Sequence, residues 1–479
     1  MEIRENADVA VLGAGPAGVA AAIAAARHGC DTVLIEQSGC SGGMAAQALV
    51  GPFMTCYDAS GTQQIIRGLF EEIVQRMTAC GGALDPAGIR AGTCYTSWIV
   101  AGHDHVTPFD PECLKRVLDE MLLEAGVRVY YHTSVLEPVM TGSRIRAVRV
   151  SSKSGIEEIG AKVFIDCTGD ADVAWRCGVP CALGDSESGR IQPATMFFRI
   201  GNVDDAKVEA EIAAHRDQFY RKDGVNYRSF HWLVTQAREH GDWPLQRTSI
   251  GLFHGVRPGE WSVNTSRLMG VDATDNRSLT QGEIEGRAQV ETIFAFLKKY
   301  VPGCEDARLL CTGATLGIRE SRHIRGRKTM QLADIEQGHV PEDTILLAAN
   351  SVDIHGRFGP LSNEYITVQN GEWYGIPYGC LLPENVENLL VAGRCVSATS
   401  EAAGAIRVMP PCTGMGQAAG TAAALACAEQ VLVRDVDIAR LQQALHSDGA
   451  YLPPEAVGGK SSGQTAAAVG ILQKTEEMT

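Results

Sequence analysis

The sequence predicts an α/β fold in which a helix-covered parallel sheet is interrupted by an inserted α+β segment. An apolar strand, a glycine-rich turn and an Ala-rich helix follow one another over about residues 7–36. From about 190 to 380, polar helical stretches alternate with short mixed strands. Gly and Ala dominate again over 388–426, where an apolar strand leads towards another helix. We therefore expect the first domain to resume after the insertion.

The first turn carries a nucleotide-binding pattern. Gly13, Gly15 and Gly18 form a G-x-G-x-x-G motif between strand and helix, and Glu36 stands at the end of the next strand. These glycines allow a tight turn, close approach of a pyrophosphate and close helix packing, while an acid at the second strand binds a ribose. The free N–H groups of the helix would hold the phosphates. This context predicts a Rossmann-like domain that binds a dinucleotide, rather than an ordinary glycine turn.

Periodicity and capping signals predict the remaining elements. Apolar residues at helical spacing predict a helix over 65–79, and Asp110 followed by Pro111 predicts a helix that ends before Gly126. Strands are expected over 127–131, 135–159 and 162–167, helices over 204–218, 227–239 and 281–300, then a strand over 389–392 and a helix over 414–428. The expected domains are a first part (1–190), a cap (191–380), a second part (381–450) and a loosely held tail (451–479).

Composition limits the class of protein. The net charge of −15 disfavours nucleic acid as a partner. The first apolar run is the predicted first strand and the longest Ala-rich run is short, so we expect neither a signal peptide nor a membrane span. The 15 cysteines include no C-x-x-C pair, which argues against an iron–sulfur cluster and a redox dithiol. A cytoplasmic protein with reduced thiols is expected.

Four separate segments together favour FAD over a nicotinamide cofactor. They are the first turn with Glu36, the turn at 42–44, the strand end at 167–170 and the strand at 391–394 with the helix after it. No second G-x-G-x-x-G motif follows, so a separate NAD(P) domain is not expected. The predicted cofactor residues, beyond those named above, are Pro16, Ala17, Gln37, Gly42, Gly43, Met44, Val135, Thr168, Gly169, Gly393, Arg394, Gly414, Met415 and Gly416. The helix expected to begin at Gly414 would direct its positive end at the flavin, unless its small residues serve only helix packing.

With these segments, the chain resembles the bacterial FAD-dependent oxidoreductases of the glutathione-reductase-like superfamily, distant relatives of the fumarate reductase flavoproteins. Further matching stretches include Gly317-Ile-Arg-Glu-Ser-Arg322, Asp353-Ile-His355 and Arg407-Val-Met-Pro410. The resemblance implies an FAD enzyme but names no substrate. Ser400 stands where the family often has His, which puts a family acid or base in doubt. Cys40, with no His beside the Gly-Gly turn, favours noncovalent FAD, with a thioether to Cys40 as the alternative.

Four residues are the candidates for catalysis. Arg319 and Arg322, expected on one face of a helix start, would anchor substrate or flavin oxygens or else form a structural Arg–Glu network. His355 would act as an acid or base at the domain junction, or be structural. Arg407 would stabilise reduced flavin or bind a carboxylate, or pair internally with Glu401.

Two other patterns are weaker candidates. His103-Asp104-His105 would supply only two imidazoles, so no metal site is predicted. Cys56 would be a redox thiol only if it were exposed.

The predicted function is an FAD-dependent dehydrogenase or oxidase that moves hydride from a small organic substrate to flavin N5. An external acceptor, which would be oxygen, a quinone or a protein, then reoxidises the flavin. The alternatives are an NAD(P)H-dependent flavin monooxygenase and, in another class, a flavin-bearing binding or tRNA-handling module. Whether the chain forms a homo-oligomer is left open.

Overall fold

A computed structural model of the chain describes residues 3–186, 188–355 and 363–453. Its main sheet has the strand order β3-β2-β1-β6-β5-β4, and β19 also pairs with β6. The strands of this sheet are β1 (Ile3–Leu12), β2 (Thr32–Ile35), β3 (Arg128–Tyr130), β4 (Ser134–Thr141), β5 (Arg144–Ser152), β6 (Gly155–Asp166) and β19 (Leu389–Val391). Strands β3, β2, β1, β6 and β19 run parallel, whereas β4, β5 and β6 form an antiparallel meander. The predicted α/β class with a Rossmann-like parallel sheet is confirmed.

Strand β6 joins two kinds of pairing along its length. Residues 155–160 pair with β5 in antiparallel fashion, and residues 164–166 pair with β19 in parallel. A segment from the other side of the insertion therefore completes the sheet beside the end of β6. The predicted domain boundaries stay a prediction, although this pairing supports a sheet built from two separate parts of the chain.

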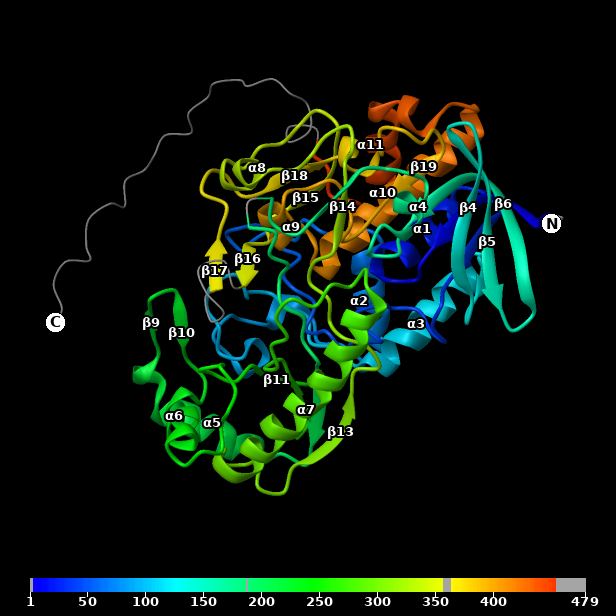
Figure 1. Cartoon of the computed structure of the whole chain (residues 1–479). Coiled ribbons are helices and arrows are strands. Elements are labelled where there is room, and N and C mark those ends of the chain that lie inside the picture. The colour runs from blue at the N-terminus through cyan, green and yellow to red at the C-terminus, as the bar shows by residue number, and fades with distance from the viewer. Residues whose placement is uncertain (1–2, 187, 356–362, 454–479) are drawn as a thin grey trace, which may run out of the picture.

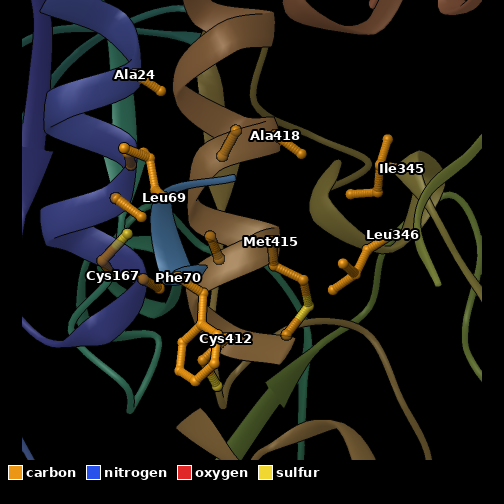
Figure 2. Packing of buried hydrophobic residues seen from close by; sticks show 14 of the residues in the cluster. Ala24, Leu69, Phe70, Cys167, Ile345, Leu346, Cys412, Met415 and Ala418 are labelled. Atoms are coloured by element: carbon orange, nitrogen blue, oxygen red, sulfur yellow. The ribbon is translucent and has the colours of Figure 1, made fainter. Parts of the chain in front are cut away.

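Helices α1 (Pro16–Arg27) and α10 (Met409–Glu429) pack against each other along their small residues. A Cβ atom added at Gly416 would lie 2.0 Å from the Ala17 carbonyl oxygen, and one at Gly420 would lie 2.1 Å from the Ala21 oxygen. Figure 2 shows α1 beside α10, with Met415 and Ala418 on α10 facing Ile345 and Leu346. The glycines of α10 therefore serve close helix packing.

Two helices of the first part begin as their local signals require. Helix α3 (Pro111–Glu124) begins after Asp110, whose side chain accepts a bond of 3.1 Å from the Glu112 N–H, so the predicted cap is confirmed. Helix α2 (Leu69–Ala79) begins later than the predicted residue 65. Gly68 has a φ of +62°, which lies outside the helical region and separates Ile65 and Ile66 from the helix.

The inserted segment contains a four-stranded antiparallel sheet with helices packed around it (Figure 1). Its order is β11-β12-β8-β13, with β8 (Phe198–Gly201), β11 (Leu252–His254), β12 (Trp261–Val263) and β13 (Arg308–Thr312). Its helices are α5 (Asp205–Ala214), α6 (His231–Glu239) and α7 (Asn276–Tyr300), and β9 (Tyr220–Lys222) pairs with β10 (Val225–Tyr227). Phe198, Phe230, Trp261 and Phe296 belong to the core between them.

Three predicted bounds in the insertion are wrong for local reasons. The stretch 204–218 is helical as α5 only to Ala214 and then continues as a 3-10 turn. Helix α6 begins at His231, because Phe230 before it is left-handed with a φ of +61°. Helix α7 begins at Asn276 and not at 281, since Asp275 caps it by accepting from the Arg277 N–H.

The remaining elements surround these two sheets. They are α4 (Asp172–Arg176), β7 (Cys181–Leu183), β14 (Arg322–Ile324), α8 (Leu332–Glu336), β15 (Thr344–Ala348), β16 (Val352–His355), β17 (Asn363–Ile366), β18 (Tyr374–Pro377), α9 (Ser400–Ile406) and α11 (Ile438–Ser447). Among the described residues, no helix is both long and apolar enough to cross a bilayer. The expectation of a loosely held tail lies almost wholly outside the described residues, which end at 453.

Candidate active site

A cavity of about 380 Å³ lies at the carboxyl ends of the parallel strands. All four segments predicted to bind the cofactor contribute to its wall, together with Val135 at the start of β4. The predicted residues that line it are Gly13, Gly15, Pro16, Ala17, Glu36, Gln37, Gly43, Met44, Val135, Thr168, Gly169, Gly393 and Arg394. Ligands of open α/β sheets bind at this edge. This cavity is the larger of two that adjoin each other, and it is the candidate cofactor site.

The glycine turn is shaped by close backbone contacts. Gly13 has a φ of +99°, and a Cβ atom there would lie 2.6 Å from the Cys167 carbonyl oxygen, so only glycine fits. A Cβ atom on Gly43 would lie 2.7 Å from the Cα atom of Gly15, so the two turns touch each other at the cavity. At the end of β2, the Glu36 carboxylate accepts bonds of 2.7 Å from the Ala14 N–H and 2.8 Å from the Ser38 N–H. These bonds fix the carboxylate in the cavity wall.

Two charged side chains hold the loop that contains Thr168 and Gly169. The buried Asp166 carboxylate accepts bonds from Thr168 and from the Val173 and Ala174 N–H groups. Arg394 donates to the carbonyl oxygens of Gly169 (2.9 Å) and Ile318 (2.7 Å) and pairs with Asp170. These three bonds use each of its nitrogen atoms, so Arg394 lines the cavity while it links the end of β19 to this loop.

The predicted start of the late helix is wrong. Helix α10 begins at Met409 and not at Gly414, because Pro410 and Pro411 occupy its first turn, where proline is favourable. Met409 and Cys412 line the larger cavity, whereas Gly414, Met415 and Gly416 do not. The first turn of α10 therefore contributes to the cavity wall through Met409 and Cys412, which the sequence pattern did not indicate. That its positive end faces the flavin stays a prediction.

Two glycines of the predicted set also lie behind the wall. Gly18 does not line the cavity. It packs against the Gly13 carbonyl oxygen, which would lie 1.8 Å from a Cβ atom added at Gly18. Gly42 packs against Ala46 and Leu114. Gly18 and Gly42 therefore allow the close packing that sets the conformation of the two turns, and other residues of these turns line the cavity.

A smaller cavity of about 170 Å³ adjoins the first one. Met44, Ile318, Arg319, Arg407 and Met409 line both cavities, so these five side chains form their shared boundary. The ionisable groups of the smaller cavity are His103, Arg228, Arg247, Arg267, Arg319, Asp353, His355, Tyr365 and Arg407. Two predicted catalytic arginines thus lie where the cavities meet, and His355 lies in the smaller one.

The two predicted arginines of the 319–322 stretch have different surroundings. The stretch does not start a helix, since Arg322 opens strand β14, so the predicted shared helical face is wrong. Arg319 donates to the Pro193 carbonyl oxygen and the Thr195 hydroxyl, each at 2.6 Å, and reaches both cavities. Arg322 pairs with Asp172 at 3.1 Å, stacks on Trp175 and lines neither cavity, so its contacts are structural.

Arg407, the third candidate, makes few hydrogen bonds. Its guanidinium donates to the Gln192 side chain at 3.3 Å and to the Asp353 carbonyl oxygen at 3.2 Å. Its Nε atom is buried without a hydrogen-bond partner in the described structure. Burial lowers the pKa of Arg407, and Asp353 offsets part of this effect. This cation therefore has spare hydrogen-bond capacity at the boundary of the two cavities.

His355 is held between an arginine and an aspartate. Its Nδ1 lies 3.2 Å from a guanidinium nitrogen of Arg267, and its Nε2 lies 3.1 Å from an Asp353 carboxylate oxygen. A guanidinium can only donate, so Nδ1 accepts and Nε2 carries the proton that is donated to Asp353. Burial lowers the pKa of His355 to about 4, although Asp353 opposes the shift. The imidazole is therefore neutral near pH 7.

Asp353 remains ionised in the same cluster. Burial would raise the pKa of this carboxyl, but His355 and the guanidinium groups of Arg407 and Arg319 hold it well below its usual range. Of its two oxygens, Oδ1 is buried and has no hydrogen-bond partner in the described part of the chain. Tyr365 on β17 lines the same cavity, and burial raises its pKa to about 12, so its hydroxyl stays protonated.

The weaker candidates are separated from one another. His103 lines the smaller cavity, whereas His105 bonds to the carbonyl oxygens of Pro86 and Gly61. Cys56 is buried, which raises the pKa of its thiol to about 12 and argues against a reactive thiolate. Ser400 begins α9 and lines neither cavity, and Cys40 accepts a bond from Gln47 at 2.8 Å.

Comparison with known protein families identifies the class. The chain matches the family model described as FAD dependent oxidoreductase over residues 8–445 and belongs to that family. It is therefore an FAD-dependent enzyme. No curated protein sequence matches the chain significantly. The wider relation to glutathione reductase and fumarate reductase flavoproteins stays a prediction.

Solved structures resemble the chain only in fold. OxyS anhydrotetracycline hydroxylase from Streptomyces rimosus is 12% identical over 92% of this chain, with a TM-score of 0.42. That alignment covers 65% of the hydroxylase chain, so this chain spans less than two thirds of its length. A geranylgeranyl bacteriochlorophyll reductase-like protein from Thermoplasma acidophilum is 14% identical over 92% of this chain and 83% of its own, with a TM-score of 0.42.

The residues of the larger cavity fit FAD. Gly15, Pro16 and Gly43 line the cavity at the first turn of α1, and a Cβ atom on Gly43 would clash with Gly15, so no side chain from that position enters between the two turns. The N–H groups of the first turn of α1 suit a diphosphate, and Glu36 at the end of β2 suits ribose hydroxyls.

The smaller cavity also contains three arginines that the sequence pattern did not indicate as site residues. They are Arg228, Arg247 and Arg267, which lie on separate loops of the insertion and converge only after folding.

Proposed function

We propose that the enzyme oxidises a small organic substrate by hydride transfer to flavin N5, and that an external acceptor then reoxidises the flavin. FAD occupies the larger cavity in this proposal, and the substrate occupies the smaller one. When bound, FAD supplies the two-electron chemistry. The observation that carries the proposal is the shared boundary of Met44, Ile318, Arg319, Arg407 and Met409, because it lets a substrate in one cavity touch a cofactor in the other.

The chain's own groups orient the substrate and move its proton. Arg319 and Arg407 present guanidinium groups at the boundary, where they fix a polar substrate group beside the reacting carbon. His355 holds its proton on Nε2 towards Asp353. We infer that an arriving polar group draws Arg267 away from Nδ1, which then accepts the proton that the substrate loses with its hydride. Oxygen, a quinone or a protein would be the final acceptor.

Anaerobic mixing tests this function. The FAD-loaded enzyme is exposed without oxygen to a panel of small acids, alcohols and amines, and separately to NADH and NADPH, while flavin absorbance is followed. Bleaching by a panel compound alone is the expected result. Bleaching by NAD(P)H alone would replace the proposal with the monooxygenase alternative, and a protein that takes up no FAD would remove both.

His355 has a more specific test. A His355→Gln variant keeps the size and polarity of the side chain but has no group that titrates near neutrality. We expect slower bleaching with unchanged FAD content. If the variant and the parent enzyme bleach at the same rate at every pH from 6 to 9, His355 has only a structural role between Arg267 and Asp353.

A further inference from the structure

The smaller cavity has a large excess of positive charge. Five arginine side chains line it, and Asp353 is the one carboxylate among its described lining residues. The two imidazoles do not add charge near pH 7, since burial lowers the pKa of both His103 and His355. Tyr365 stays protonated. The five arginines are Arg228, Arg247, Arg267, Arg319 and Arg407.

Four of these arginines form two pairs, and the fifth, Arg267, contacts His355. Arg319 and Arg407 line both cavities and so lie beside the cofactor site. Arg228 and Arg247 line only the smaller cavity and so lie away from that boundary. Both of the latter belong to the insertion: the Arg228 N–H donates to the Ser249 hydroxyl at 3.0 Å, and the Trp243 indole donates to the Arg247 carbonyl oxygen at 2.8 Å. The loops that carry this second pair are thereby anchored to the insertion.

Among the residues that the structure describes, neither pair is in direct contact with a carboxylate, although Asp353 lies near enough to Arg319 and Arg407 to offset part of the effect of burial on their pKa values. Within the described ranges, no ion pair is formed by Arg228, Arg247, Arg319 or Arg407 with any carboxylate. The partners of Arg319 are neutral oxygens of Pro193, Thr195 and Asn264. The Nε atom of Arg247 is buried and has no hydrogen-bond partner in the same residues.

Buried cations that form no ion pair are costly to the folded protein. Transfer of a charge out of water is unfavourable unless a partner compensates it. In agreement, burial and neighbouring guanidinium groups lower the pKa of Arg247, and burial with Arg407 lowers the pKa of Arg319 to about 9. An anionic ligand would relieve this cost at both places, because the planar guanidinium fork binds carboxylate and phosphate oxygens in pairs.

We propose that the substrate is an organic dianion, with one acid group on Arg319 and Arg407 and a second on Arg228 and Arg247. The carbon skeleton between the acid groups lies against the apolar part of the wall, which includes Val50, Phe197 and Phe253. The inference rests on the proposed function only in assigning the smaller cavity to the substrate. The second acid group is a carboxylate or a phosphate, since the same guanidinium geometry recognises both.

Calorimetric titration of the FAD-loaded enzyme tests the dianion directly. The probes are succinate, glutarate and adipate, the monocarboxylates of equal length, the matching uncharged diols, and 3-phosphoglycerate. We expect the best dianion to bind at least about 10-fold more tightly than its monocarboxylate, since a charge-assisted bond at the second site is lost. Tight binding of 3-phosphoglycerate alone would assign the second group as phosphate. Equal binding of diacids, monoacids and diols would overturn the proposal.

Variants locate the second acid group. Arg247→Gln and Arg228→Gln should each weaken dianion binding about 10- to 100-fold and leave monocarboxylate binding and FAD content unchanged. Arg277→Gln is the matched control, because this exposed arginine of the insertion lines neither cavity. Full dianion affinity in both variants would overturn the second site. If one variant fails to fold, the other decides.

The same samples separate this inference from the proposed function. Binding of a dianion without anaerobic bleaching of the flavin would support the site and contradict oxidation of that ligand. Bleaching by uncharged compounds, with no binding of any dianion, would overturn the inference and leave the proposed hydride transfer in place.

Discussion

The contact between α1 and α10 can be tested by adding a single methyl group. In a Gly416→Ala variant the new Cβ atom would lie 2.0 Å from the Ala17 carbonyl oxygen, where ordinary contact begins at 3.4 Å. No side-chain rotation can absorb this overlap, because the opposing atoms are backbone. The two helices must therefore separate.

The expected magnitude follows from two opposing effects. Overpacking of a close contact costs about 1–3 kcal/mol, and the upper part of this range applies where backbone must move. Replacing glycine by alanine inside a helix returns about 1 kcal/mol. The free energy of unfolding should therefore fall by about 2 kcal/mol. FAD affinity should fall as well, since Ala17 lines the larger cavity.

Urea unfolding followed by circular dichroism measures the first effect, and flavin fluorescence titration measures the second. Gly88→Ala is the control, since an added Cβ atom there has nothing within 4 Å, and its effect should stay within about 0.5 kcal/mol. A Gly416→Ala enzyme that unfolds at the same urea concentration as the parent would refute the helix contact and the reasoning built on it.

Three other predictions concern cofactor affinity, pH and thiol chemistry. Glu36→Gln should weaken FAD binding about 10- to 100-fold, because a charged acceptor at the cavity wall is lost; a fluorescence titration with unchanged affinity would contradict this. The pKa of His355 falls from 6.5 to about 4 on folding. Between these two pH values the unfolded chain binds a proton on this imidazole and the folded enzyme does not. The free energy of unfolding should therefore drop by up to about 3 kcal/mol between pH 6.5 and pH 4. Unfolding curves of His355→Gln should lack this part of the pH dependence, and equal pH dependence in both proteins would rule it out. The Cys80 and Cys113 sulfur atoms lie 2.7 Å apart, so the two-electron oxidant diamide should couple them, with a mass loss of about 2 Da that disappears in Cys113→Ser; a persistent loss in that variant would point to another pair.

Local patterns are sufficient to predict the fold, and most of the predicted cofactor residues line the larger cavity. The first turn and Glu36 lie in the cavity wall. Their positions could be predicted because a single strand–helix–strand unit, which is short in sequence, sets them. The cap at Asp110 is predictable for the same reason. By contrast, the start of α10 is predicted too late, because its glycines are a weaker boundary signal than Pro410 and Pro411. A proline pair just inside the start of a small-residue helix was the available signal.

The smaller cavity, where we propose that the substrate binds, depends on tertiary convergence, which local spacing does not encode. Arg228 and Arg247 lie on separate loops of the insertion, while Arg319 and Arg407 come from segments on either side of β19. Helical spacing would place Arg319 and Arg322 on one face, yet this stretch is not helical and Arg322 opens strand β14, so the two side chains have different partners. Whether a given arginine binds substrate or supports the fold depends on its partners, as the pairing of Arg322 with Asp172 illustrates.

The double pairing of β6 has a consequence for synthesis on the ribosome. The chain leaves the ribosome from its N-terminus, so residues 164–166 and the whole insertion emerge before β19 is available to pair with β6. During that interval one edge of the parallel sheet has unpaired backbone groups, which favour association with other chains. The wall of the cofactor cavity also stays incomplete until Met409 and Cys412 emerge. We therefore expect FAD to bind only after most of the chain has been synthesised. Truncated products that end before residue 389 should be prone to aggregate.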